Sequence, residues 1–276
     1  MRPGQLAVPF KKFTGSGNDF IFFDTRSELV ARDELETPGM IASLCARGTG
    51  IGADGAVFVA ADDAADLRIR YYNADGSRAS LCGNAGLCTV RFAAEQEIGG
   101  KLRREVTIAT DAGLVTGRIT HNDWPEIDLD AVTDLVVDRA VTVPPAEARR
   151  IGFAVVGVPH LVVLVGDVAS IDVVGVGRPL RRDPRLGAPG ANVNFVSAAP
   201  GFPMRTYERG VEGETLACGT GAVATAALLV AWGLANEAPV SLSMPRGLLS
   251  VRFSGGSRPS LKGEGRLVFE GTFPVD

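Results

Sequence analysis

The sequence predicts an α+β protein built from two halves of similar design. Three observations support this fold class: short β-type runs dominate the chain, helical periodicity is clear in only a few segments, and one local pattern occurs twice. Because the strands do not alternate regularly with helices, a doubly wound parallel sheet is disfavoured. With 276 residues, 46% of them hydrophobic and 22% charged, the chain is long enough for two domains with hydrophobic cores.

The predicted strands are short apolar runs bounded by Gly, Asp or Pro. In chain order they are Phe20–Asp24, Ala56–Ala60, Leu67–Asn73, Val106–Ala109, Leu114–Thr120, Glu126–Leu129, Phe153–Val165, Asn192–Ser197, Met204–Glu208, Val240–Ser243, Leu248–Phe253 and Leu267–Phe273. The predicted helices are Thr37–Ala46, Asn84–Glu97 and Gly219–Leu234. Surface loops are expected at Pro144–Pro145 and over residues 181–190.

The repeated pattern is a strand end, a polar turn and a Cys-Gly pair that opens a helix. It runs from Tyr72 to Asn84 and again from Tyr207 to Thr220, with nearly equal spacing to the cysteine. Such an internal repeat predicts two pseudo-symmetric domains. We expect an N-terminal half of residues 1–121, which includes Cys82 and takes back the last strand (265–276), and a C-terminal half of residues 122–264, which includes Cys218.

Composition excludes several classes of protein. The net charge of −4 provides no positive field for phosphate, so nucleic acid is not an expected partner. The longest nearly apolar run, Ala222–Ala235, is too short to cross a bilayer, so no membrane is expected either. Residues 1–13 lack the apolar core of a secretory signal. The four cysteines form no disulfide framework and no Cys/His zinc pattern. We therefore expect a cytoplasmic protein with reduced thiols and no metal.

The two cysteines of the repeat suggest proton-transfer chemistry. Each lies directly before a helix start, where backbone N–H groups and the helix dipole stabilise a thiolate and can hold a substrate carboxylate. If the halves close on one another, a small amino acid lies between Cys82 and Cys218. A base on one side of its α-carbon and an acid on the other can invert that centre.

No cofactor is expected for this reaction. Amino-acid racemases commonly use pyridoxal phosphate bound to a lysine. The four lysines, Lys11, Lys12, Lys101 and Lys262, do not lie beside a phosphate-binding loop. The remaining cysteines, Cys45 and Cys88, lack the repeated context and are expected to be core or surface thiols outside the site.

Eight ordered motifs along nearly the whole chain resemble those of the diaminopimelate epimerase family. They are Thr14–Phe20, Gly50–Gly55, Asn73–Ser77, Cys82–Asn84, Gly157–His160, Asn192–Phe195, Glu208–Gly210 and Gly213–Gly221. The resemblance implies a cofactor-independent two-cysteine epimerase that interconverts LL- and meso-diaminopimelate, a step in lysine and peptidoglycan biosynthesis. It also implies two domains, each a mostly antiparallel strand barrel around a central helix, with the site in the cleft between them. A homodimer is implied as well.

The resemblance also assigns site residues. Cys82 and Cys218 are the expected acid/base pair, supported by His160 and Glu208. Further residues are expected to bind the substrate: the helix starts at Gly83, Asn84, Gly219 and Thr220 through backbone N–H groups, and Asn18, Asn73, Asn192, Glu208 and Arg209 through side chains.

Three positions depart from the family pattern. Thr14 replaces a His, Leu87 replaces an Arg, and Val158 replaces an Asn that would bind the distal end of the substrate. The change at Val158 leaves open a racemase of another amino acid on the same scaffold. Two alternatives of other classes are a thiol redox sensor, in which Cys82 and Cys218 form a reversible disulfide, and an amino-acid-binding protein that does not exchange the α-proton.

Overall fold

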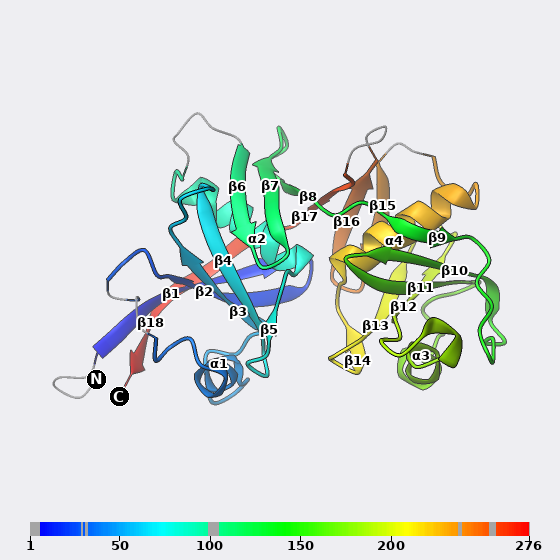
Figure 1. Cartoon of the computed structure of the whole chain (residues 1–276), viewed down its shortest axis with the longest axis horizontal. Helices are drawn as coiled ribbons and strands as arrows, with labels where there is room; N and C mark the ends of the chain where they lie inside the picture. Colours follow the sequence, from blue (N-terminus) through cyan, green and yellow to red (C-terminus); the bar gives the residue numbers. More distant parts are fainter. Residues whose placement is uncertain are drawn as a thin grey trace. The chain divides into compact units, whose positions relative to one another are not determined.

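The computed structural model describes residues 6–28, 30, 33–98, 105–236, 239–253 and 258–275. Residues 1–5, which belong to the N-terminal segment 1–13 expected to lack a secretory signal, lie outside these ranges. The chain forms two compact units: unit 1 contains residues 1–127 and 264–276, and unit 2 contains residues 128–263. Strands dominate both, which confirms the predicted α+β class (Figure 1). In the described ranges, no helix has the length and apolar character needed to span a bilayer.

Unit 1 is a strongly curved sheet around one helix. Its strands are β1 (Leu6–Gly15), β2 (Asn18–Asp24), β3 (Gly55–Ala60), β4 (Leu67–Asn73), β5 (Arg78–Ala79), β6 (Glu105–Thr110), β7 (Gly113–Ile119), β8 (Pro125–Asp128) and β18 (Arg266–Val275). The order is β8-β7-β6-β4-β3-β2-β1-β18, and β5 pairs with β4. Only the β2/β3 and β4/β6 pairs in this described sheet are parallel. The short helix α1 (Pro38–Cys45) follows the loop after β2.

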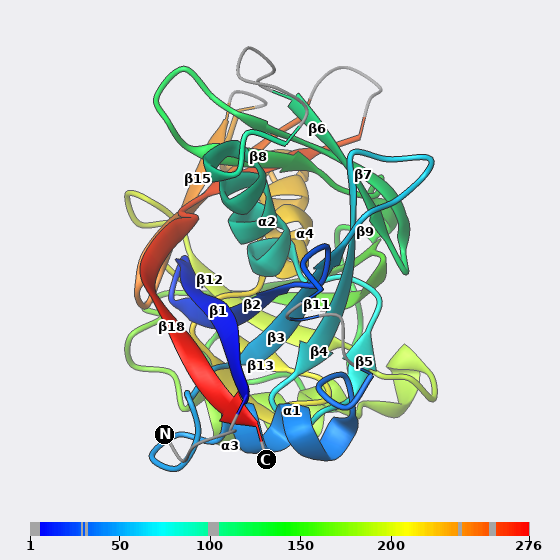
Figure 2. The same cartoon turned by 90° about the vertical axis from the view of Figure 1, so that its left-hand side faces the viewer.

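The central helix of unit 1 is α2 (Gly83–Glu95). It packs against β1, β7 and β18 (Figure 2). Nearly all of its residues are buried. Close packing depends on Gly117 of β7, because a Cβ there would lie 2.2 Å from Val90 Cγ2. On α2, Phe92 stacks on Phe22 with ring centroids 5.8 Å apart. This packing fixes the helix, and therefore its N-terminus, against the sheet.

Unit 2 repeats the plan with a second buried helix. Its strands are β9 (Thr133–Val136), β10 (Ala148–Val156), β11 (Val158–Val165), β12 (Asn192–Ser197), β13 (Met204–Glu208), β14 (Gly213–Thr215), β15 (Val240–Met244), β16 (Gly247–Arg252) and β17 (Ser260–Gly263). Strands β14-β13-β12-β11-β10-β9 form one sheet, in which only β11/β12 is parallel among the described pairs, while β15, β16 and β17 pair in sequence. The apolar helix α4 (Gly219–Ala231) packs against β10, β11, β12, β15 and β16.

Several predicted elements were wrong in detail. The run Phe153–Val165 is not one strand but the β10/β11 hairpin, which turns at Gly157 with φ +65°. Residues 181–190 are not only loop: they contain the end of helix α3 (Val173–Arg181) and a 3-10 turn at Pro184–Leu186. The sequence did not predict α3 because two glycines and Pro179 weaken its helix propensity. Asp172 compensates by accepting a hydrogen bond from Gly175 N.

Candidate functional site

The two cysteines of the repeated pattern occupy equivalent positions in their units. In unit 1, the β4/β5 hairpin leads to Cys82, which is the N-cap of α2. In unit 2, the β13/β14 hairpin leads to Cys218, which is the N-cap of α4. Both have extended backbone, with φ −121° and ψ 123° at Cys82 and φ −135° and ψ 108° at Cys218. The sequence repeat therefore corresponds to a repeated structural unit.

Each helix start presents backbone N–H groups beside its cysteine. The carbonyls of Cys82 and Cys218 accept the first helical hydrogen bonds, from Gly86 N and Ala222 N at 2.9 Å. The N–H groups that precede these donors have no acceptor within the helix, because the first turn of an α-helix leaves them unsatisfied. In the described chain, neither thiol makes the side-chain hydrogen bond that caps a helix. Both helix starts can therefore bind an anion such as a carboxylate.

In unit 1, the structure brings Asn18 and Asn84 together next to Cys82. Asn84 is 1% exposed, and its Nδ2 donates to Asn18 Oδ1 at 2.7 Å. Asn84 Oδ1 is buried and has no hydrogen-bond partner among the described residues. Since a buried acceptor without a donor costs about 1–3 kcal/mol, this oxygen is suited to an N–H group of a ligand.

A charged network behind Asn18 holds its amide in place. Asp54 Oδ2 accepts from Asn18 Nδ2 at 3.0 Å, and Arg47 Nη2 contacts Asp54 Oδ1 at 2.8 Å and Asp19 Oδ1 at 2.6 Å. The buried Lys12 adds an ion pair to Asp19 at 2.8 Å. Burial alone raises the pKa of Asp19, but hydrogen bonds from Arg47 and Lys12 outweigh it and hold that pKa below its ordinary value. Asp19 therefore stays ionised, and through Arg47 it helps to hold Asp54 against Asn18.

Asn73 lies at a different kind of position. It ends β4 and begins a tight turn, in which Gly76 N donates to Asn73 O at 2.9 Å and Asn73 N donates to Ser77 O at 2.9 Å. Its side-chain Nδ2 donates to Ser77 Oγ at 3.0 Å. Asn73 thus has a structural role in the turn that leads to Cys82.

In unit 2, strand register gathers polar side chains on one face of the sheet. His160 on β11 is opposite Asn192 on β12, and Asn194 is opposite Thr206 on β13. Glu208, two residues after Thr206, shares that face because side chains two apart in a strand point the same way. Residues of the other face, such as Phe195 and Tyr207, lie in the hydrophobic core. The sheet thus separates a polar face from an apolar one.

His160 is buried and neutral. It has 0% exposure, and burial together with the charge of Arg209 lowers its pKa to about 3. Asn194 Nδ2 lies 3.3 Å from His160 Nδ1. His160 Nε2 is buried without a hydrogen-bond partner in the part of the chain that the structure describes.

Glu208, Arg209 and Asn192 meet at the end of β13. Thr215 Oγ1 donates to Glu208 Oε2 at 2.7 Å, and Arg209 N donates to Asn192 Oδ1 at 2.7 Å. The second contact fixes the backbone that follows β13. Asn192 therefore shapes the segment that holds the half-buried Arg209.

The first turn of α4 packs directly on this polar face. Cys218 Sγ lies 3.7 Å from Thr220 Oγ1. A Cβ at Gly221 would lie 2.4 Å from Asn194 Oδ1 and 3.1 Å from Cys218 Sγ. Only glycine permits this approach, which places the thiol next to the residues around His160.

Comparison with known proteins decides the family. The family model described as "Diaminopimelate epimerase" matches residues 10–133 and 152–267. The chain belongs to the diaminopimelate epimerase family. A diaminopimelate epimerase of Gemmatimonas aurantiaca is 46% identical over 278 residues, which cover 96% of this chain and 98% of that protein. One of Aquifex aeolicus is 37% identical over 275 residues, with 96% and 97% covered.

Solved structures share the two-domain fold of this family member at low sequence identity. A phenazine biosynthesis protein of the PhzF family from Enterococcus faecalis superposes with a TM-score of 0.73 at 15% identity, covering 98% of this chain and 100% of that one. A hydroxyproline epimerase from Agrobacterium vitis gives a TM-score of 0.68 at 15% identity, with 98% and 93% covered. These similarities confirm the fold class.

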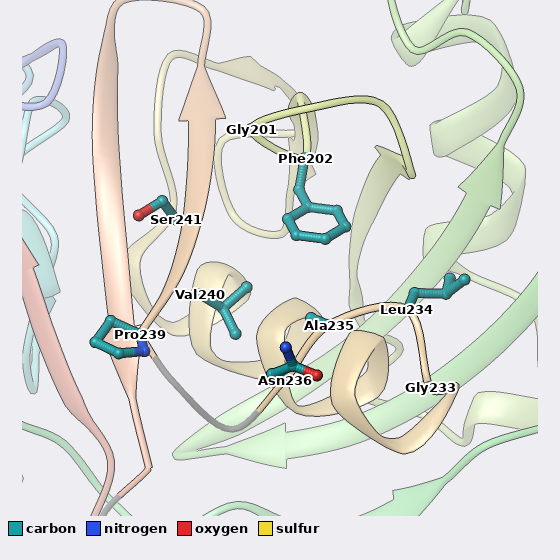
Figure 3. Close-up of a pocket in the computed structure, with 9 residues that line it drawn as sticks. All are labelled: Gly201, Phe202, Gly233, Leu234, Ala235, Asn236, Pro239, Val240 and Ser241. Atoms are coloured by element: carbon teal, nitrogen blue, oxygen red, sulfur yellow. The ribbon is translucent and has the colours of Figure 1, made fainter.

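A cavity of about 410 Å³ in unit 2 lies at the other end of α4 (Figure 3). It is lined by Gly201, Phe202, Gly233, Leu234, Ala235, Asn236, Pro239, Val240 and Ser241. These residues carry no charge, and Gly233 follows the C-terminus of α4 whereas Cys218 precedes its N-terminus. The described lining of this cavity therefore lies at the end of α4 opposite to Cys218.

Sequence reasoning missed the side chains that support the site. Asp54 and Asn194 lie inside the motifs Gly50–Gly55 and Asn192–Phe195, yet neither was singled out. A signal was present for Asn194, because Asn192 and Asn194 alternate on a strand and must share one face. No comparable local signal linked Arg47 to Asn18, since their connection passes through Asp54.

Proposed function

We propose that this protein is a cofactor-independent diaminopimelate epimerase in which Cys82 and Cys218 act as acid and base at the α-carbon. The observation that carries the proposal is that each cysteine begins a buried helix in a repeated unit of a chain that belongs to this family. A thiol at such a position is stabilised as a thiolate by the helix N-terminus.

The reaction balances with two thiols alone. One cysteine thiolate removes the α-proton and becomes a thiol, and the electron pair left on carbon is delocalised into the adjacent carboxylate. The other cysteine gives its thiol proton to the opposite face of the carbon and becomes a thiolate. Product leaves with inverted configuration and with the protonation of the cysteines exchanged, which solvent then resets.

The developing charge on the carboxylate is met by the two helix starts. Backbone N–H groups at Gly83–Asn84 and Gly219–Thr220 donate to its oxygens, and these bonds strengthen as charge builds up on them. Fixed dipoles of this kind need no reorganisation during the reaction. This is the role of a carbanion-stabilising group, which in many racemases belongs to a cofactor.

Side chains around each helix start bind the rest of the substrate. The orphaned Asn84 Oδ1 accepts from an ammonium group of the substrate, and Asn18 holds Asn84 in position. Arg209 binds the distal carboxylate, since a guanidinium matches that group with two parallel hydrogen bonds. The substrate is bound further by Asn73, Asn192 and Glu208. His160 and Glu208 also support ionisation of the two thiols.

Val158 favours a second candidate within the same chemistry. It is the first residue of β11, directly after the turn at Gly157, and is half-buried. A valine there provides no hydrogen bond to a polar distal group. A racemase of a shorter or more apolar amino acid is therefore the second candidate.

Conversion of LL- to meso-diaminopimelate by the purified protein tests the proposal. We expect turnover that persists with a chelator and with hydroxylamine, which traps aldehyde cofactors. Cys82→Ser and Cys218→Ser should each lower kcat by about 10²–10⁴-fold, the usual contribution of a general acid or base. Cys45→Ala is the matched control: this thiol is buried in unit 1, where burial raises its pKa to about 11, and its loss should leave turnover intact.

Other outcomes identify the alternatives. Exchange of the α-proton in another amino acid, but not in diaminopimelate, supports the racemase. Binding without any exchange supports an amino-acid-binding protein. Absence of turnover together with a Cys82–Cys218 disulfide in non-reducing peptide maps supports a redox sensor.

The compartment and assembly belong to the same proposal. Catalysis requires reduced thiols, which the cytoplasm maintains. None of the four cysteines, all of which lie in the described ranges, forms a disulfide in the structure. A homodimer follows from the family resemblance and is testable by light scattering.

A further inference from the structure

Asn194 makes a set of hydrogen bonds that leaves its amide only one orientation. Its Nδ2 donates to Leu161 O at 3.3 Å, and Thr206 Oγ1 donates to its Oδ1 at 3.0 Å. Because a backbone carbonyl can only accept, the nitrogen must face Leu161. The amide nitrogen has two protons, and the second one faces His160 Nδ1 at 3.3 Å.

This orientation determines which ring nitrogen of His160 carries the proton. An amide N–H can pair with Nδ1 only if Nδ1 is an acceptor. His160 is fully buried, and Arg209 places a positive charge near it, so the ring is neutral. A neutral ring whose Nδ1 accepts must have its single proton on Nε2.

The remaining donor is Nε2–H, and it is unsatisfied. Nε2 is buried with no hydrogen-bond partner among the described residues. A buried donor without an acceptor is costly, so this N–H is suited to an acceptor that a ligand or an anionic group of the site supplies.

Asn194 also lies against the cysteine-bearing helix. A Cβ added at Gly221 would lie 2.4 Å from Asn194 Oδ1 and 3.1 Å from Cys218 Sγ, so these two atoms are close to one another. The charged group that acts on His160 is Arg209, and Cys218 lies close to Asn194, whose amide contacts the ring. A donor at Nε2 stabilises an anion in this region, whereas a base would require Nε2 to be deprotonated.

We propose that Asn194 is a positioning residue that fixes His160 as the Nε2–H tautomer, so that the ring offers the site a hydrogen-bond donor at Nε2. The tautomer follows from the contacts within unit 2. Its catalytic consequence, stabilisation of an anionic group at the site, rests on the proposed function.

Nitrogen-15 NMR of the histidine rings tests the tautomer directly. The chain has two histidines, so His121→Gln leaves His160 as the only signal. His121 is exposed in the turn before β8. We expect the spectrum of the Nε2–H tautomer between pH 5 and pH 8. A spectrum of the Nδ1–H tautomer, or of an imidazolium in that range, would overturn the proposal.

Two variants separate positioning from simple stability. In Asn194→Asp, a carboxylate that only accepts replaces the donor, so we expect His160 to change to the Nδ1–H or the charged form and kcat to fall at least 10-fold with a smaller change in KM. Thr206→Val removes a hydrogen bond from the same cluster but leaves Asn194 Nδ2 facing His160. It should lower Tm without changing the tautomer.

The results separate this inference from the proposed function. If Asn194→Asp retains the Nε2–H tautomer, or if Thr206→Val changes it, the assignment to Asn194 is wrong. If the tautomer behaves as expected but the wild-type protein does not epimerise diaminopimelate, only the proposed function is wrong. If Asn194→Asp does not fold, the wild-type and Thr206→Val spectra still decide the assignment.

Discussion

Gly221 on α4 lies directly against Asn194 on β12, so closely that a Cβ at Gly221 would be 2.4 Å from Asn194 Oδ1. The same Cβ would be 3.1 Å from Cys218 Sγ. One glycine thus allows a cysteine-bearing helix to pack on the polar face of a sheet. This contact brings the thiol of unit 2 next to the residues that determine the state of His160.

Gly221→Ala should impair both stability and activity. Alanine favours a helix over glycine by about 1 kcal/mol, but overpacking a well-packed contact costs about 1–3 kcal/mol. Because Asn194 is held by hydrogen bonds to Leu161, Thr206 and His160, it has little freedom to move away. We expect a lower Tm and a kcat reduced about 10-fold or more.

Gly39→Ala is the matched control for this substitution. Gly39 also lies in a helix, α1, and a Cβ there would have no neighbour within 4 Å. It should leave kcat unchanged and keep or raise Tm. Equal effects of the two substitutions on kcat would show that the contact at Gly221 is not special.

Arg47→Met should weaken substrate binding more than it weakens the fold. The Arg47 side chain is 62% exposed, so its ion pairs contribute only about 0–1 kcal/mol to stability. It nevertheless orients Asp54, which holds Asn18. We expect KM to rise several-fold with little change in Tm.

Arg26→Met is the control variant. Arg26 forms an ion pair with Asp24 at 2.6 Å and is not part of the network that holds Asn18. Its KM should equal that of the wild type. An unchanged KM in Arg47→Met would show that this network does not support substrate binding.

Acid should destabilise unit 2 through His160. The pKa of His160 in the folded protein, about 3, lies below the ordinary value of 6.5, so the unfolded chain binds the extra proton first. The stability contributed by the neutral ring is complete above about pH 6.5 and is lost as the pH falls toward 3. We expect the free energy of unfolding to decrease with acidification by up to about 1.4 kcal/mol per pH unit from this group.

His160→Gln isolates this contribution, because glutamine does not titrate. Denaturant unfolding at pH 7, 6, 5 and 4 should give a shallower pH dependence for the variant than for the wild type. Parallel curves would contradict a buried neutral histidine.

Val158→Asn should change the activity on diaminopimelate very little. Asparagine restores a hydrogen-bonding group at the start of β11, where it can meet a polar distal group of the substrate. If the natural substrate is diaminopimelate, the change in kcat/KM should be within a few-fold. A rise of 10-fold or more, with loss of activity on a smaller amino acid, would favour the racemase.

What the sequence could predict depended on how local the signal was. Cys82 and Cys218 were predicted as equivalent because each helix start is encoded by adjacent residues, and the structure places both as N-caps. Asn18 and Asn84 came only from a motif resemblance, and their direct contact was not foreseen.

The supporting residues depend on strand register and on contacts between distant segments. Asn194 reaches His160 only because β11 and β12 pair in parallel, a pairing that no local pattern encodes. Asp54 reaches Asn18 because β2 and β3 also pair in parallel. Helix α3 was missed since packing and the Asp172 cap, not propensity, stabilise it. The assignment of both thiols to one α-carbon remains a proposal.

Turnover of LL-diaminopimelate in D₂O tests the central claim most directly. With two thiols, the base removes protium while the acid, already exchanged with solvent, delivers deuterium. Early in the reaction, the α-hydrogen of newly formed meso-diaminopimelate should therefore be deuterium, while unreacted LL-diaminopimelate retains protium. Cys82→Ser and Cys218→Ser should each slow this incorporation by about 10²–10⁴-fold. Transfer of protium into the product, or equally fast deuteration of remaining substrate, would contradict a mechanism with one cysteine acting as base and the other as acid.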